Sequence, residues 1–328
     1  MRRVSDVLTR GLFFLAVLAG CSATGPGQQR EGALATRPPG VELAAVPFFP
    51  QQEHACGPAA LASLLVRSGV ATDPLLLSDE IYLPGREGTL TPELTASVRR
   101  HGRLPEVLPA QLDSVFDAVA AGHPVLVLQN LGLDWIPRWH YAVVVGYDLG
   151  RSEILLRSGS DARMRMSFFT FEKTWMRSGG FALIVLRPGE DPVAANAASW
   201  FATLAQSGAA VPAWTAATRK WPEDPQAWFG LGNAALTQVT PDGAAAVSAW
   251  REAIRVDPRF VPGYNNLALL LARRGALTEA RGLIEQAHVL LSDPALPASA
   301  SLREQVEDSR RQILAGQIRP DGGNAAAH

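Results

Sequence analysis

The apolar positions in the first half of the chain change from a helical to a strand-like spacing. An apolar run behind Cys56-Gly57-Pro58 predicts a helix that ends near Gly69, because proline is favoured in the first turn of a helix. Two further helices are expected over 91–100 and 110–121, the first of them closed by Gly102. This part of the chain is therefore predicted to be mainly helical.

From residue 124 onward the pattern is that of short buried strands. The expected strands cover 124–128, 139–147, 153–156, 163–169 and 181–186, with a short helix over 171–177 before the last one. Helices followed by an antiparallel meander indicate an α+β domain. We place this domain at residues 41–189.

An internal repeat follows a change of composition at 189–198. Its two copies are Trp214, Ala217, Pro222, Trp228 and, 36 residues later with the same spacings, Trp250, Ala253, Pro258, Tyr264. The pattern resembles the tetratricopeptide repeat with a short insertion near Thr240, and the alternative is a generic helical bundle. We therefore expect an all-α domain over 195–316, with a degenerate first repeat at 195–222 and a solvated last helix at 301–314. Residues 317–328 are expected to form a disordered tail.

Size and composition limit the classes of function. The 328 residues, 47% of them hydrophobic, are enough for two domains with ordinary cores. The formal net charge of -1 provides no basic surface, so no nucleic-acid partner is expected. Two cysteines and six scattered histidines do not make a structural zinc set, and no metal or other cofactor is expected.

Residues 1–20 predict an export signal rather than a part of the fold. Basic residues precede an apolar run over 12–19, which is much shorter than the roughly 20 residues of a membrane span. The run ends in Leu18-Ala19-Gly20-Cys21, which resembles the lipobox of bacterial lipoproteins; the alternative is an ordinary signal with an incidental cysteine. The resemblance implies a lipid on Cys21 that anchors the chain to a membrane through a flexible tether over 21–40. Because Ser22 rather than aspartate follows, it also implies the periplasmic face of the outer membrane.

Cys56 is the candidate nucleophile. It stands at a predicted helix N-terminus, where backbone N–H groups favour an anion such as a thiolate. With Cys21 lipidated, Cys56 has no disulfide partner in an oxidising compartment, which favours catalysis over the alternative of a buried core cysteine. Gln51 and Gln52 lie just upstream, and either can supply an amide donor to an oxyanion.

His140 is the candidate base for Cys56. It opens an apolar β-run, so the end of a strand would present it, and a base lies near its nucleophile in space rather than in sequence. The alternative for a histidine at such a place is a satisfied structural role. His54 is an alternative base that lies only two residues before Cys56 in the sequence, and we expect it to flank the cleft.

The two segments together resemble a known family. Gln51-x-x-x-x-Cys56-Gly-Pro-Ala-Ala-Leu and His140-Tyr-Ala-Val-Val-Val-Gly-Tyr-Asp are similar to the papain-like peptidases that process double-glycine bacteriocin leaders. They are most similar to stand-alone lipoprotein relatives that carry tetratricopeptide repeats. The resemblance covers about residues 41–188 and implies an α+β papain-like cysteine peptidase domain. It also implies that Cys56 is the nucleophile, His140 the general base and acid, and an upstream glutamine the oxyanion donor.

Two positions depart from the family pattern. The family's glutamine stands six residues before the cysteine, where this chain has Pro50; we favour Gln51 for this role, with Gln52 as the alternative. The family's Asp-Pro after the histidine strand is not matched. We expect Ser158 to orient the imidazole instead, with Asp161 as the alternative third member.

The predicted function is that of a membrane-anchored thiol peptidase. It would hydrolyse peptide bonds of a peptide or protein substrate through an acyl-enzyme. The repeat domain is expected to bind a protein partner in its concave groove. The alternatives are a catalytically weak or inactive peptidase-like scaffold whose repeats bind partner proteins, and amide hydrolysis or acyl transfer on cell-wall peptides.

Overall fold

The computed structural model describes residues 37–51 and 55–318. The signal segment, Cys21, most of the tether, His54, Gln52 and the tail from residue 319 lie outside the described residues. Of the helices that the structure describes, none has the length and apolar character needed to cross a membrane.

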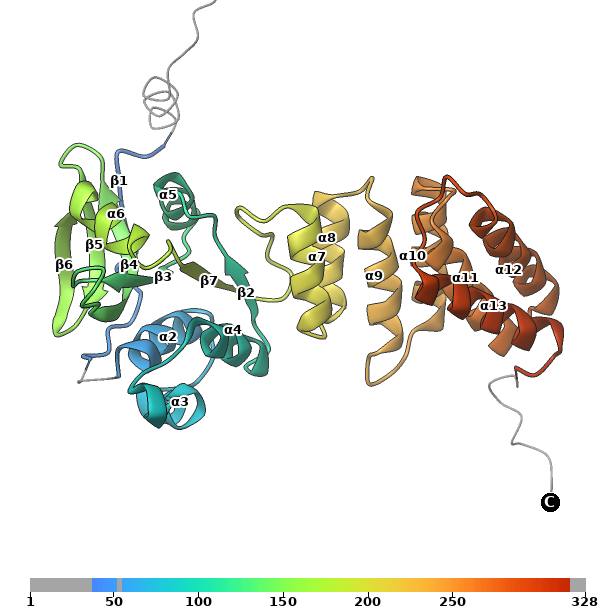
Figure 1. Cartoon of the computed structure of the whole chain (residues 1–328), viewed down its shortest axis with the longest axis horizontal. Helices are drawn as coiled ribbons and strands as arrows, with labels where there is room; N and C mark the ends of the chain where they lie inside the picture. Colours follow the sequence, from blue (N-terminus) through green and yellow to red (C-terminus); the bar gives the residue numbers. More distant parts are fainter. Residues whose placement is uncertain (1–36, 52–54, 319–328) are drawn as a thin grey trace, which may run out of the picture. The chain divides into compact units, whose positions relative to one another are not determined.

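A seven-stranded antiparallel sheet forms the centre of the N-terminal domain (Figure 1). The strands in spatial order are β2 (Leu104–Val107), β7 (Ala182–Leu186), β3 (Val125–Asn130), β4 (Trp139–Asp148), β5 (Glu153–Ser158) and β6 (Asp161–Ser167), and β1 (Gly40–Glu42) pairs with β4. Strands β3 to β6 form the expected meander. The expected strand over 181–186 is present as β7, but it does not continue the meander. Helix α6 (Phe168–Met176) returns the chain across the sheet, and β7 pairs between β2 and β3.

Helices cover both faces of this sheet (Figure 1). On one face lie α2 (Cys56–Arg67), α3 (Pro74–Ile81), the short 3-10 helix η1 (Pro84–Arg86) and α4 (Thr91–Arg100). On the other face lie α5 (Leu112–Ala120) and α6. The apolar side of α2 packs on the sheet through residues such as Leu61 and Leu65, which contribute to one core with Tyr141 and Val143 of β4. This packing fixes the N-terminus of α2 beside the start of β4.

The C-terminal domain is entirely helical in the part that the structure describes. Its helices are α7 (Ala197–Gln206), α8 (Val211–Lys220), α9 (Pro225–Leu236), α10 (Gly243–Val256), α11 (Val261–Arg273), α12 (Leu277–Leu291) and α13 (Ala300–Leu314). Equivalent aromatic residues of the two predicted repeats make equivalent bonds. Trp228 Nε1 donates to the carbonyl oxygen of Pro222 at 2.8 Å, and the Tyr264 hydroxyl donates to that of Pro258 at 3.1 Å.

The tryptophans that open the repeated pattern pack against glycines of α9. A Cβ on Gly230 would lie 2.1 Å from the ring of Trp214, and one on Gly232 would lie 2.4 Å from the ring of Trp250. The missing side chains therefore leave space for the indole rings between neighbouring helices.

A short linker joins β7 to α7 and is held by one buried carboxylate. Glu106 of β2 is 2% exposed and accepts N–H bonds from Val193, Ala194 and Ala195 at 2.8, 2.6 and 2.7 Å. Three donors compensate for the desolvation of the carboxylate. The residues just before α7 are thereby attached to the edge strand of the sheet.

Candidate active site

Cys56 is the first residue of α2 and is half-buried, as predicted for a helix N-terminus. The residue after it must be small. A Cβ on Gly57 would lie 2.8 Å from both Cβ and Oγ1 of Thr89, so glycine lets the start of α2 lie against the segment 86–92. Pro58 in the first turn has no N–H to leave unsatisfied.

His140 is the second residue of β4, and Ser158 is the last residue of the neighbouring strand β5. The ring nitrogen Nε2 of His140 lies 2.8 Å from Oγ of Ser158, which is 5% exposed. Asp161, the alternative, is exposed at the start of β6 and accepts the backbone N–H of Arg163. Of the two residues, the structure places Ser158 on the imidazole.

The contact with Ser158 engages Nε2 of His140 and leaves Nδ1 as the nitrogen that can act as a base. If Nε2–H donates to Ser158, then Nδ1 is unprotonated and can accept a proton. Burial lowers the pKa of His140, and the positive charge of Arg138 lowers this pKa further. Both effects favour the neutral imidazole, which is the form a general base requires.

Gln51 is held at both ends of its side-chain amide. Nε2 donates to the carbonyl oxygen of Tyr141 at 3.2 Å, and Oε1 accepts the backbone N–H of Gly159 at 2.9 Å. These partners determine the orientation of the amide, because a carbonyl can only accept and a backbone N–H can only donate. The backbone N–H of Gln51 also donates to the carbonyl oxygen of Gly159 at 2.9 Å. One N–H of the Gln51 amide has no partner in these bonds and can serve a ligand.

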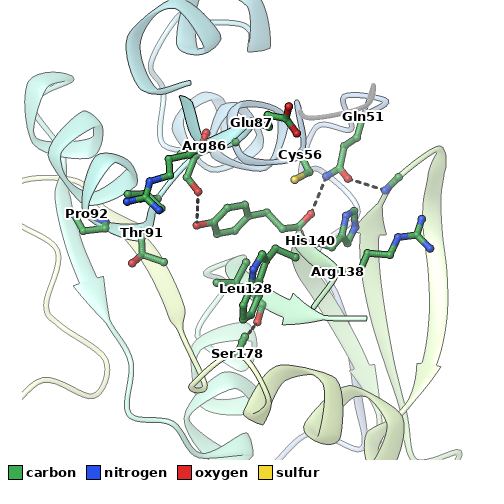
Figure 2. Close-up of a pocket in the computed structure, with 16 residues that line it drawn as sticks. Gln51, Cys56, Arg86, Glu87, Thr91, Pro92, Leu128, Arg138, His140 and Ser178 are labelled. Atoms are coloured by element: carbon green, nitrogen blue, oxygen red, sulfur yellow. Dashed lines mark hydrogen bonds between the residues drawn. The ribbon is translucent and has the colours of Figure 1, made fainter. Parts of the chain in front are cut away.

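One cavity of about 770 Å³ brings Gln51, Cys56 and His140 together (Figure 2). Its remaining walls come from segments 86–92 and 138–141 and from Leu128, Gly159 and Ser178. The buried Tyr141 hydroxyl donates to the carbonyl oxygen of Thr89 at 3.1 Å, and burial raises the pKa of Tyr141, so it remains a neutral phenol. This volume is sufficient for a short stretch of extended peptide.

Several residues of the site were not found from the sequence. Segment 86–92 forms a whole wall but carries no catalytic pattern, and Arg138 was not distinguished from other surface cations. Gly159 has a φ of +59°, which favours glycine, and its bonds to Gln51 could not be predicted from the sequence. Gln52 and His54, the alternatives near Cys56, lie outside the described residues.

Comparison with protein families agrees with both domains. Residues 43–183 match the model of the Peptidase C39 like family, and residues 197–247 and 242–299 match the tetratricopeptide repeat. The N-terminal domain is a C39-like peptidase domain. Tetratricopeptide repeats follow it, so the predicted order of an α+β papain-like domain and an all-α repeat domain is confirmed.

Solved structures similar to the C39-like domain include three peptidases. A protein described as a C39-like peptidase from Bacillus anthracis is 18% identical, with 45% of this chain and 98% of that chain covered and a TM-score of 0.40. The peptidase domain of Streptococcus ComA, a bifunctional ABC transporter, is 22% identical, with 43% of this chain and 98% of that chain covered and a TM-score of 0.36. Xylellain, a cysteine protease from Xylella fastidiosa, is 13% identical, with 48% of this chain and 89% of that chain covered and a TM-score of 0.35. A search of curated proteins found no match.

Proposed function

We propose that this protein is a cysteine peptidase that cleaves peptide bonds through an acyl-enzyme on Cys56. The main support is that Cys56 and His140, 84 residues apart in the sequence, line one cavity together with the amide of Gln51. A nucleophile at a helix N-terminus, a half-buried imidazole with a lowered pKa and an oriented amide donor are the parts that acyl transfer requires. The C39-like fold agrees with this chemistry.

The reaction follows from the positions of these groups. Nδ1 of His140 takes the proton of the Cys56 thiol, and the thiolate attacks the carbonyl carbon of the substrate. The free N–H of Gln51 and the backbone N–H groups at the start of α2 stabilise the oxyanion. As the C–N bond breaks, the imidazolium donates its proton to the leaving amine. Water then attacks the thioester with His140 as base, which releases the acid and restores the thiol.

Ser158 orients the imidazole during these steps. Its hydroxyl accepts from Nε2 of His140 and holds the ring angle and the tautomer. A hydroxyl carries no negative charge, so it stabilises the imidazolium less than a carboxylate would. We therefore assign Ser158 a positioning role of modest size.

The location and the partner are part of the same proposal. A lipid on Cys21 would attach the enzyme to the outer membrane, facing the periplasm. Incorporation of a radioactive fatty acid into the wild type and not into Cys21→Ser is the expected result. The repeats would bind a protein segment, and a cavity of about 610 Å³ formed by α7, α8 and α9 supports this, with Phe201, Phe229 and Asn233 in its lining.

The deciding experiment is labelling of Cys56 by a peptidyl acyloxymethyl ketone. The full chain with Cys21→Ser has a single thiol, because the sequence contains only two cysteines. We expect His140→Ala to slow the labelling by about 100-fold or more, since loss of a general base costs 10² to 10⁴. His101→Ala is the matched control, because His101 bonds Glu80 and does not line the cavity. Equal labelling of His140→Ala and wild type would favour the inactive scaffold.

A further inference from the structure

Strands β3 and β4 are joined by a hairpin over 131–139, whose last residue, Trp139, is the first residue of β4. The backbone N–H of Leu131 donates to the carbonyl oxygen of Arg138 at 2.9 Å. Further along, Leu133 and Ile136 exchange both N–H···O bonds, at 3.1 and 3.2 Å. The hairpin therefore keeps a paired backbone up to its turn at Asp134 and Trp135.

Side-chain bonds at its base make this hairpin rigid. Asn130 is 2% exposed, and its Oδ1 accepts the backbone N–H groups of Gly132 and Arg138, both at 2.9 Å. A Cβ on Gly132 would lie 2.3 Å from the carbonyl oxygen of Ile136, so the two arms approach closely only because this residue is glycine. The hairpin is thus preorganised, which lowers the entropy cost of binding.

The hairpin presents large apolar side chains to solvent. They are Leu131, Leu133, Trp135, Ile136 and Trp139, with Trp135 75% and Ile136 66% exposed. The pairing of Leu133 with Ile136 and of Leu131 with Arg138 puts Leu131, Leu133 and Ile136 on one face of the hairpin, with Trp135 in the turn and Trp139 on the other face. A surface of this kind indicates a binding site rather than a random scatter of exposed residues.

This surface continues into the active-site cleft. Arg138 and Trp139, at the base of the hairpin, line the same cavity as Cys56 (Figure 2). The next residue in the chain is His140. The hairpin is therefore an extension of the cleft wall on the side of the imidazole.

The chemistry of the proposed reaction decides which part of a substrate passes there. His140 must donate a proton to the leaving amine, so that nitrogen and the residues after it lie on the His140 side of the cleft. We propose that the hairpin 131–139 binds the substrate polypeptide C-terminal to the scissile bond and selects large apolar side chains there. This inference rests on the proposed peptidase activity and adds its substrate preference.

A polypeptide fits the hairpin better than a lipid surface does. Asp134 is exposed in the turn, between Leu133 and Trp135. Insertion of these apolar residues into a bilayer would carry the carboxylate with them, which is costly in the hydrocarbon region and unfavourable beside anionic lipids. A peptide can contact the apolar side chains and leave Asp134 in water.

The test is the cleavage of a mixed library of proteome-derived peptides by the full chain, with cut sites identified by mass spectrometry. We expect the wild type to favour Leu, Ile, Phe or Trp within the first three positions after the cut. Leu133→Ser/Ile136→Ser should reduce this preference about tenfold and leave the preference before the cut unchanged. The control Leu75→Ser/Leu76→Ser removes two exposed leucines of α3, which are 79% and 61% exposed and do not line the cavity, and should behave as the wild type.

Trp135→Ser is a second variant in case the double variant does not fold. It should also weaken the preference for large apolar residues after the cut. Cleavage without a preference after the cut, equal loss in the α3 control, or loss only before the cut would each overturn the inference and leave the peptidase proposal intact. Sedimentation of the wild type but not of the hairpin variant with phosphatidylethanolamine–phosphatidylglycerol vesicles, together with an unchanged cleavage preference, would overturn it in favour of a membrane. Absence of any cleavage by the wild type would refute the peptidase activity and the inference with it.

Discussion

The two domains hold their key groups together over very different distances in the sequence. In the C39-like domain, Gln51 bonds Tyr141 and Gly159, which are 90 and 108 residues away. In the repeat domain, Trp228 bonds Pro222 only six residues away, and the second repeat makes the same bond. The candidate active site thus depends on the positions of a few atoms that are determined by the whole sheet, whereas the repeats depend on local volumes. Mutations should therefore affect the two domains in different ways.

The largest effect is expected from the nucleophile. Cys56→Ala should lower peptide turnover by at least about 10³-fold, because removal of a nucleophile leaves only substrate binding and the oxyanion donors. The melting temperature should change little, because the residue is half-buried at the start of a helix. Turnover and thermal unfolding by circular dichroism check this. Cys21→Ser is the control, and a comparable loss of activity there would contradict the assignment of Cys56.

The repeat domain should respond through packing. Gly232→Ala places a Cβ 2.4 Å from the ring of Trp250 and should destabilise the protein by about 1–2 kcal/mol. Gly282→Ala, in the middle of α12 with open space around it, should stabilise it by about 0.5–1 kcal/mol through helix propensity. Urea unfolding measures both, and Cys56 labelling should stay unchanged. Stabilisation by Gly232→Ala would show that packing does not control this position.

Within the active site, a smaller effect distinguishes Ser158 from Asp161. Ser158→Ala removes one neutral hydrogen bond to His140, worth about 1 kcal/mol, and should lower turnover roughly five-fold. Asp161→Ala, which removes the acceptor of the Arg163 N–H, should leave turnover nearly unchanged. A hundred-fold loss for Asp161→Ala with the fold retained would make that carboxylate the third catalytic member.

The smallest effect concerns the charge around His140. Because burial and Arg138 both lower its pKa, its titration midpoint should lie below the ordinary value of about 6.5. Arg138→Gln removes the repelling charge and should raise the midpoint, while burial, the larger cause, remains. An NMR titration of the imidazole in a Cys56→Ala background measures the shift. Arg86→Gln, also in the cavity wall, should leave the midpoint unchanged.

Local patterns were enough to predict the elements that carry the two main candidates. Gly-Pro followed by an apolar run fixes a helix start at Cys56, and the β-branched run after His140 fixes a strand start. Both signals lie within a few residues, where propensity and periodicity act. The position of Ser158 was predictable because it closes the next strand of the meander.

Non-local features could not be predicted in the same way. The helix α3 carries three consecutive leucines, two of them exposed, so it shows no helical periodicity. The strand β2 is four residues long and contains Pro105, which argued against a strand. The pairing of β7 between β2 and β3 depends on the path through α6. Segment 86–92 reaches the site through the packing of Thr89 against Gly57 and through the bond from the Tyr141 hydroxyl to the carbonyl oxygen of Thr89.

Glu106 has a practical consequence for dividing the protein into fragments. A C39-like fragment that ends near residue 189 would lose the N–H groups of Val193, Ala194 and Ala195, leaving a buried carboxylate without these three donors. Loss of the partners of a buried charge typically costs several kcal/mol. Such a fragment would be expected to aggregate or to unfold at its sheet edge. This instability could then be misread as evidence that the C39-like domain needs the repeats in order to fold. A fragment that ends after Asn196 keeps the three donors, so its stability would report the effect of removing the repeats alone.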